Sequence, residues 1–217
     1  MVRPCIAALT PYSTARDEYK GELGVFLDAN ESPYENGYNR YPDPHQRRLK
    51  EQIAMIKGVE AENIFIGNGS DEAIDMVFRV FCEPRVDNVV AIAPSYGMYK
   101  VAAAINDVEM REVALGEEFE LRVEAVLAEV DENTKAIFLC SPNNPTGNLL
   151  RREDVMRLVK ECRAMVVVDE AYIDFAEAES LKSEIAENKN LIVLQTMSKA
   201  WAMAGLRVGL ALADRRV

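Results

Sequence analysis

Residues 135–168 read KAIFLCSPNNPTGNLLRREDVMRLVKECRAMVVV, and their pattern of apolar and polar residues indicates the fold class. An apolar run at 135–140 is followed by a turn rich in proline and asparagine, then by an amphipathic segment at 152–162 and a second apolar run at 165–168. Short apolar runs that alternate with amphipathic segments are typical of parallel strands joined by crossover helices. The stretch therefore predicts a strand, a helix and a second, parallel strand.

The same alternation extends from about residue 64 toward the end of the chain. It predicts strands at residues 64–66, 89–93, 108–113, 135–140, 165–168, 191–195 and 208–213. It predicts helices at residues 45–56, 71–81, 122–129, 152–162 and 179–187. We expect an α/β fold, namely a right-handed, three-layer α/β/α sandwich around a mainly parallel, seven-stranded sheet.

Residues 1–40 show neither periodicity and are interrupted by glycines and prolines, among them Pro11, Pro33 and Gly37. We expect them to form an irregular N-terminal arm, and residues 41–217 to form one large domain. The chain stops four residues after the last predicted strand, in a polar sequence and without a closing helix. The large domain is therefore expected to be incomplete, and the chain to be a fragment.

The 217 residues include 36 acidic and 25 basic side chains, which gives a net charge of −11 at pH 7. This charge argues against nucleic acids or anionic membranes as partners because both are polyanions. One histidine and four widely spaced cysteines do not suit a metal site, and the cysteines are expected to be reduced thiols. The sequence shows no apolar run of roughly 18 residues and no signal peptide, which predicts a cytoplasmic location.

The strongest chemical signal is the sequence TMSK at residues 196–199, directly after the predicted strand 191–195. A lysine at the carboxyl end of such a strand faces the crevice where open α/β sheets bind ligands, and there Lys199 could act as a nucleophile. Arg207 follows eight residues later. For the short motif alone, a solvated surface lysine is the alternative interpretation.

Two further polar groups follow apolar strands. The sequence SPNNPTGN at 141–148 holds two asparagines between prolines, so that an amide can bond a ligand oxygen, although a plain turn is the alternative. Asp169 ends the strand 165–168 and needs a cationic or donor partner there, with Tyr172 three residues on. The alternative for Asp169 is the N-cap of a short helix.

Two loops nearer the N-terminus complete the set. The sequence GNGSDE at 67–72 joins a strand to a helix whose first-turn N–H groups form an anion site, although capping by Ser70 or Asp71 is the alternative. Glu72 stands where a dinucleotide-binding fingerprint needs a third glycine, so a nucleotide-binding module is disfavoured. Tyr96 follows the strand 89–93 and could stack on a planar ligand, or could simply pack.

Together these strand ends offer a nucleophilic lysine, a carboxylate, amide and phenol donors, a stacking ring and backbone N–H groups for a phosphate. A planar aromatic aldehyde with a ring nitrogen, a phenolic oxygen and a phosphate fits all of them. That molecule is pyridoxal phosphate.

The sequence resembles the fold-type I aminotransferases over essentially its whole length, and among them it is most similar to the histidinol-phosphate aminotransferase family. The motifs that carry this resemblance are LTPYSTAR at 9–16, DANE at 28–31, NRYP at 39–42, YGMY at 96–99, CSPNNPTG at 140–147, VDEAY at 168–172, SKA at 198–200 and AGLR at 204–207. In that family a smaller C-terminal domain follows the large one, and it is absent from this sequence.

The resemblance also implies a role for each residue that matches a family motif. It implies that Lys199 bonds covalently to the cofactor, that Asp169 holds the pyridine nitrogen protonated, and that Tyr96 stacks on the ring. It implies that Asn144 and Tyr172 bond the phenolic oxygen. The residues implied for the cofactor phosphate are Ser70, Asp71, Ser198, Arg207 and Tyr41 of the partner subunit.

For the substrate, the resemblance implies contacts from Tyr12, which matches a position that helps to hold a phosphate, and from Asn30. The expected reaction converts histidinol phosphate and 2-oxoglutarate to imidazole acetol phosphate and glutamate, in a homodimer. The alternatives are an aromatic or broad-specificity aminotransferase, a threonine-phosphate decarboxylase, and a catalytically silent, cofactor-binding fragment.

Overall fold

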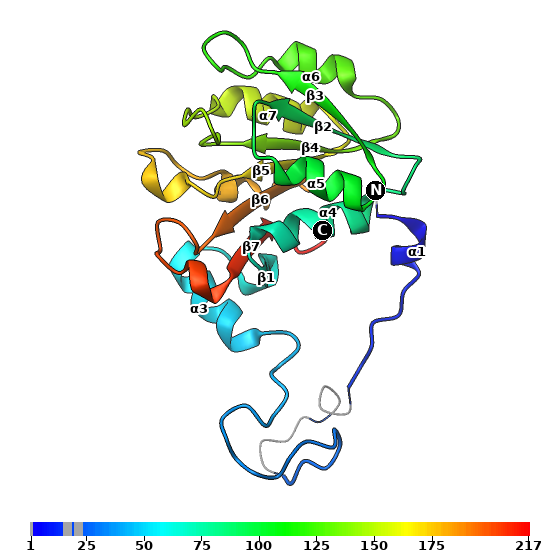
Figure 1. Cartoon of the computed structure of the whole chain (residues 1–217), viewed down its shortest axis with the longest axis vertical. Helices are drawn as coiled ribbons and strands as arrows, with labels where there is room; N and C mark the ends of the chain where they lie inside the picture. The colour runs from blue at the N-terminus through cyan, green and yellow to red at the C-terminus, as the bar shows by residue number, and fades with distance from the viewer. Residues whose placement is uncertain (1, 15–18, 20–23) are drawn as a thin grey trace.

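A computed structural model describes residues 2–14, 19 and 24–217, and a seven-stranded sheet lies at its centre (Figure 1). The strands are β1 Ile64–Asn68, β2 Asn88–Ala93, β3 Glu109–Ala114, β4 Thr134–Cys140, β5 Met165–Asp169, β6 Leu191–Thr196 and β7 Val208–Ala213. All seven predicted strands are confirmed, each to within two residues at its ends.

The strands follow the order β1-β7-β6-β5-β4-β2-β3 across the sheet. Strand β7 is antiparallel to both of its neighbours, β1 and β6, while the other neighbouring strands pair in parallel. The carboxyl ends of β1, β2, β4, β5 and β6 therefore share one edge. Because β7 runs the other way, its first residue lies at that same edge.

The helices are α1 Pro4–Ala7, α3 Arg47–Lys57, α4 Ser70–Phe81, α5 Met98–Ile105, α6 Val123–Glu129 and α7 Arg152–Glu161. Short 3-10 turns occupy Ala61–Asn63, Ile173–Phe175, Leu181–Glu184 and Ala204–Leu206. The sequence interpretation missed α5. Its residues, MYKVAAAI, are apolar almost all round and therefore show little helical periodicity.

Two helix predictions need correction. The helix expected at 179–187 is only the 3-10 turn Leu181–Glu184, whose start is capped by Ser180. At its end, the Glu184 carbonyl accepts both the backbone N–H and the side-chain Nδ2 of Asn188, which forms a turn in place of further helix. The helix expected from residue 45 starts at Arg47 instead. The Asp43 carboxylate there accepts hydrogen bonds from the backbone of residues 45 and 47, each at 2.9 Å.

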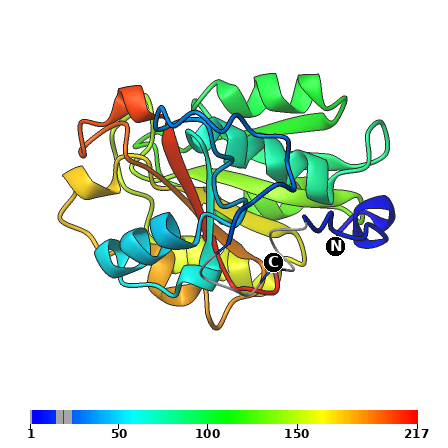
Figure 2. The same cartoon turned by 90° about the horizontal axis from the view of Figure 1, so that it is seen from below.

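Helices cover both faces of the sheet, which gives the expected three layers. One apolar core lies under α4 and α5, and a second lies under α3, α6 and α7. Successive residues of β5 alternate between the two cores, with Met165 and Val167 on one face and Val166 and Val168 on the other. Figure 2, the view from below, shows α4 and α5 above the sheet and α3 beneath it.

The N-terminal arm begins against the domain and then leaves it. The Arg3 backbone N–H donates to the Val80 carbonyl at 2.9 Å, next to the short helix α1, which the sequence interpretation did not predict. The described part of the segment between α1 and α3 extends away from the three layers (Figure 1). Residues 15 and 16 of the LTPYSTAR motif lie outside the described residues. The division at residue 40 stays a prediction.

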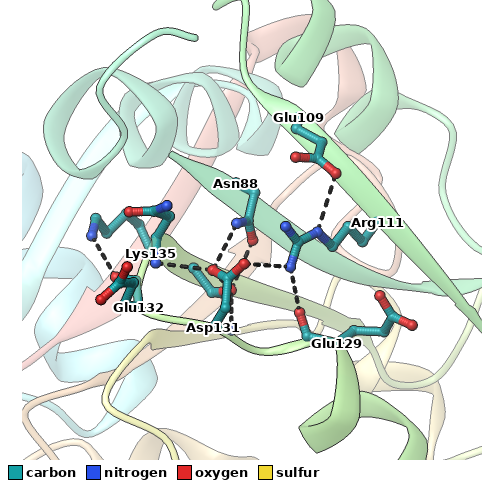
Figure 3. A network of polar contacts seen from close by, with 9 residues as sticks. Asn88, Glu109, Arg111, Glu129, Asp131, Glu132 and Lys135 are labelled. Carbon is teal, nitrogen blue, oxygen red and sulfur yellow. Dashed lines mark hydrogen bonds and ion pairs between the residues drawn. The ribbon is translucent and has the colours of Figure 1, made fainter. Parts of the chain in front are cut away.

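A polar network joins three strands at the edge opposite their carboxyl ends (Figure 3). Asn88 Nδ2 donates to Asp131 Oδ1 at 2.9 Å, and the Thr134 hydroxyl donates to Asn88 Oδ1 at 2.7 Å. Arg111 pairs with Asp131 at 2.8 Å and with Glu109 at 3.1 Å. Hydrogen bonds from Asn88 and Arg111 hold the pKa of Asp131 well below its usual value. The network fixes the starts of β2, β3 and β4 relative to one another.

Within the described ranges, no helix is both long and apolar enough to cross a bilayer.

Candidate active site

The loop between β1 and α4 meets the residue that precedes β7. The Gly69 N–H donates to the Arg207 carbonyl at 2.7 Å, and Arg207 Nη1 donates to the Ser198 hydroxyl at 3.3 Å. Gly69 has a φ of +80°, and a side chain there would overlap with the guanidinium. Helix α4 starts with Ser70 and Asp71 at the same point. A helix N-terminus beside a guanidinium and a hydroxyl can bind an anion such as phosphate.

Asp169 ends β5 and is buried, with 3% of its surface exposed. Its Oδ1 accepts the backbone N–H of Ala171 at 3.0 Å, and its Oδ2 accepts the Tyr99 hydroxyl at 2.9 Å. The short helical turn that follows begins at Ile173 with Tyr172 at its N-cap, so Asp169 is not the N-cap of a helix. Burial raises the pKa of Asp169 to about 6, and both hydrogen bonds act in the opposite direction. A carboxylate held in this way can pair with a cationic ligand atom.

Tyr96 links the starts of two helices on the same face of the sheet. Its hydroxyl donates to Asp71 Oδ1 at 3.0 Å, and its ring meets that of Tyr99 edge-on, with centroids 5.7 Å apart. Burial, followed by the nearby Asp71 carboxylate, raises the pKa of Tyr96 to about 12. The phenol is therefore protonated at neutral pH. It connects the anion site formed by Ser198, Arg207 and the first turn of α4, called the anion corner below, to the surroundings of Asp169.

The two asparagines after β4 differ in their surroundings. Asn143 is buried, and its Nδ2 donates to the Pro94 carbonyl at 3.0 Å and to the Thr146 hydroxyl at 2.7 Å. Its Oδ1 accepts the Ser95 hydroxyl at 2.9 Å. These bonds use Asn143 to join two loops, while the half-buried Asn144 faces a cavity.

That cavity has a volume of about 560 Å³, and both Asn144 and Tyr172 line it. Lys199 lies in the turn after β6, exposed to solvent, with its Nζ 5.3 Å from the centroid of the Tyr172 ring. The structure thus brings the candidate nucleophile to the phenol that is predicted to bind the same ligand.

Three of the predicted site residues do not lie at the site edge of the sheet within a single chain. Tyr12, Asn30 and Tyr41 all belong to the N-terminal segment, and all three are exposed. Tyr12 is 90% exposed and Tyr41 70%. Their roles stay predictions that depend on a partner or on substrate.

Two features of the site were absent from the sequence interpretation, which assigned no role to Tyr99 or to Gly69. Tyr99 lies in the first turn of α5, whereas Tyr96 precedes that helix, which begins at Met98. Because α5 was not predicted, no signal in the sequence indicated that Tyr99 points toward Asp169. Among the residues that the structure describes, there is no group of three His, Cys, Asp or Glu side chains suited to a metal ion.

A model of the family "Aminotransferase class I and II" matches residues 20–217. The chain belongs to the class I and II aminotransferases. A histidinol-phosphate aminotransferase of Parabacteroides distasonis is 57% identical over 217 residues, and one of Bacteroides thetaiotaomicron is 56% identical over 218. In both comparisons the match covers 100% of this chain but 63% of the relative, so the chain spans less than two thirds of those curated aminotransferases.

Solved aminotransferase structures share the fold. A histidinol-phosphate aminotransferase from Sinorhizobium meliloti, in complex with pyridoxal-5'-phosphate, superposes with a TM-score of 0.75 at 28% identity, over 82% of this chain and 49% of that one. An L-threonine-O-3-phosphate decarboxylase from Porphyromonas gingivalis gives 0.67 at 27% identity, over 82% and 52%. The predicted resemblance to this family and its large-domain fold are confirmed.

Proposed function

We propose that the chain carries the cofactor site of a pyridoxal-phosphate-dependent histidinol-phosphate aminotransferase. The observation that supports it most is the meeting of an anion corner at Arg207, a buried carboxylate at Asp169 and a lysine at Lys199 along one edge of the sheet. The relatives with more than 50% identity are named histidinol-phosphate aminotransferases, which supports histidinol phosphate as the substrate. We propose 2-oxoglutarate as the acceptor of its amino group.

The described residues fit each part of pyridoxal phosphate. The phosphate suits the corner formed by Ser198, Arg207 and the first turn of α4, where Gly69 leaves room for the guanidinium. The ring nitrogen suits Asp169, and Lys199 supplies the amine that bonds to the aldehyde carbon. Asn144 and Tyr172 are the donors for the phenolic oxygen.

When bound, pyridoxal phosphate supplies an electron sink for negative charge on the carbon that bears the substrate amine. Asp169 would keep the ring nitrogen protonated, which strengthens that sink. Lys199 would be the base that carries the proton removed from the substrate carbon, because its amine lies in the turn at this edge of the sheet. Arg207 would bind the phosphate through its guanidinium, whose several N–H donors a lysine would not reproduce.

The proposed enzyme is a cytoplasmic homodimer. The arm supports this because it leaves its own domain and exposes aromatic side chains, among them Tyr34, Tyr38 and Tyr41. In the dimer, Tyr41 of the partner subunit would complete the phosphate corner. Tyr12 and Asn30 would contact the substrate.

Covalent labelling tests the cofactor site. The purified chain is mixed with pyridoxal phosphate, its absorbance is recorded, and borohydride then fixes any bound cofactor for peptide mass analysis. We expect one pyridoxyl phosphate on the peptide that contains Lys199, and none on that peptide in a Lys199→Arg variant. Reproducible labelling of Lys135 or Lys160 instead would contradict the proposed site.

Substrate choice needs a separate assay. Loaded protein is mixed with histidinol phosphate or with threonine phosphate, and amino transfer in a single turnover is followed by absorbance, with carbon dioxide release measured in parallel. Transfer from histidinol phosphate supports the aminotransferase. Carbon dioxide release from threonine phosphate would instead favour the decarboxylase activity that the Porphyromonas gingivalis structure's name describes.

A further inference from the structure

Tyr99 is a buried residue that contacts two of the assigned site residues, Tyr96 and Asp169. It occupies the first turn of α5, is 1% exposed, and stacks on Phe138 of β4 with ring centroids 5.1 Å apart and planes 24° apart. Its edge meets Tyr96, the residue implied for stacking on the cofactor. Two rings thus fix where the Tyr99 hydroxyl points.

That hydroxyl donates to Asp169 Oδ2 at 2.9 Å, across 70 residues of sequence. The other carboxylate oxygen accepts the Ala171 N–H at 3.0 Å, so the two bonds together fix the plane of the carboxylate. Both donors favour the charged form, since a hydrogen bond given to a carboxylate is stronger than one given to the neutral acid.

The surroundings otherwise oppose a charge on Asp169. It is buried, and the carboxylates of Asp71 and Glu170 lie near enough to disfavour a further negative charge. Tyr99 itself stays protonated, because burial and the adjacent Asp169 raise its pKa well above the usual value. The bond therefore keeps its donor on the phenol and its acceptor on the carboxylate over the whole neutral range.

We propose that Tyr99 is a positioning residue for the aminotransferase site, because its hydroxyl orients Asp169 and keeps it ionised for the cofactor's ring nitrogen. This inference rests on the proposed function. Tyr99 does not touch the reacting atoms and acts through Asp169 alone, which separates its role from that of Tyr96.

The test compares wild-type protein with Tyr99→Phe, which keeps the ring and removes the hydroxyl. In the cofactor-free protein, the carboxyl carbon of Asp169 is titrated by ¹³C NMR, with its signal assigned by its loss in Asp169→Asn. We expect the substitution to raise the pKa of Asp169 by about one unit, the size of one hydrogen bond to a charged group. An unchanged value would overturn the proposal.

The dissociation constant of pyridoxal phosphate gives a second readout. With the pKa of Asp169 moved from about 6 to about 7, the ionised fraction falls about fivefold at pH 6 and hardly at pH 8. Tyr99→Phe should therefore weaken binding about fivefold more at pH 6 than at pH 8. Phe138→Leu, which disturbs the same ring but keeps the hydroxyl, should weaken binding equally at both pH values.

The outcomes separate the two proposals. A wild-type protein that binds no pyridoxal phosphate overturns the proposed function and this role with it. If the wild-type protein binds pyridoxal phosphate but Tyr99→Phe weakens that binding equally at pH 6 and pH 8, only the role of Tyr99 is overturned. If Tyr99→Phe does not fold, replacing tyrosine by the more acidic 3-fluorotyrosine should lower the pKa of Asp169, and no change would contradict the inference.

Discussion

Gly209 of β7 lies against the backbone nitrogen of Ser70, with no room for a side chain between them. This close approach packs the first turn of α4 against β7. It also places Arg207, two residues before Gly209, at the anion corner. A Cβ at Gly209 would overlap with the peptide bond before Ser70. The geometry of the phosphate site thus depends on a glycine that touches no ligand.

Gly209→Ala should both destabilise the protein and weaken its hold on phosphate. Forcing an extra methyl group into a close contact costs about 1–3 kcal/mol, and here the displaced group is the backbone of the proposed phosphate loop. We expect the affinity for pyridoxal phosphate to fall at least roughly tenfold, because a loss of about 1.4 kcal/mol in binding free energy corresponds to a factor of about ten. An absorbance titration measures this affinity. Gly205→Ala is the matched control because a Cβ there meets nothing within 4 Å. Equal behaviour of the two variants would contradict the packing argument.

The stability of the cofactor-free protein should depend on the charge of Asp169. Its pKa is about 6 in the folded protein against an ordinary value of 3.8, so the folded state binds this proton more tightly than the unfolded state. The ionised carboxylate therefore costs stability, and this cost is absent below pH 3.8, grows through pH 6 and is complete above it.

Asp169→Asn removes that charge. We expect the free energy of unfolding of the variant, relative to wild type, to rise by up to about 3 kcal/mol between pH 4 and pH 8 in urea titrations. The amide keeps an oxygen for the Ala171 N–H, but its NH2 group replaces the oxygen that accepts the Tyr99 hydroxyl. This change is present at both pH values and cancels in the comparison. A difference that does not change with pH would mean that Asp169 is not destabilised by burial. In the loaded protein, the same substitution should reduce turnover by at least about 10²-fold to 10³-fold.

Asn88→Ala should destabilise the sheet without affecting the cofactor site. Asn88 is 2% exposed, and its loss removes both the nearer acceptor of the Thr134 hydroxyl and the Nδ2 donor to the Asp131 carboxylate at the far edge of the sheet. The loss of a hydrogen bond to a charged group costs about 1.5–3 kcal/mol, which urea unfolding at pH 7 would detect. Glu132→Ala is the control, since Lys135 bonds only its backbone carbonyl there, and it should change stability by less than about 0.5 kcal/mol. Weakened cofactor binding in Asn88→Ala would show that the two edges are coupled.

Glu170→Ala should loosen the loop that carries Tyr172. The Glu170 carboxylate, 3% exposed, accepts the Leu181 N–H at 2.8 Å and Gln195 Nε2 at 3.0 Å, and so ties both ends of the 170–181 loop to β6. Amide hydrogen exchange at Leu181 should accelerate, with the free energy of unfolding lowered by about 1–3 kcal/mol. Glu179→Ala, an exposed position in the same loop, should leave the exchange unchanged. Unaltered protection at Leu181 would show that its anchor lies elsewhere.

The amino-acid sequence determined the strands and the loops that hold the chemistry. Apart from the edge strand β3, whose sequence EMREVA is half polar, each strand is a short and largely apolar run. Such a run predicts its own position because burial on both faces of the sheet admits few polar residues. Once the strands are parallel, the residues that follow them share one edge. This local rule is enough to place Ser70, Tyr96, Asn144, Asp169 and Lys199 at the same edge of the sheet.

Local patterns were less informative for two short segments. The amphipathic run at 179–187 predicted a helix, yet only the four-residue turn Leu181–Glu184 forms, with its first N–H held by the carboxylate of Glu170, eleven residues earlier. The segment of α5 predicted nothing definite, because its exposed face also carries apolar residues, Val101 and Ile105, and this removes the periodicity.

The tertiary structure alone decided which strand lies beside which, because the pairing of distant strands depends on packing that no short window of sequence contains. The antiparallel β7 enters between β1 and β6, and this brings Arg207 to Gly69, 138 residues earlier in the chain. The stacking of α5 on β4 brings the Tyr99 hydroxyl to Asp169 in the same way. The sequence thus determined which groups stand at the edge of the sheet, and the packing of distant segments decided which of them touch.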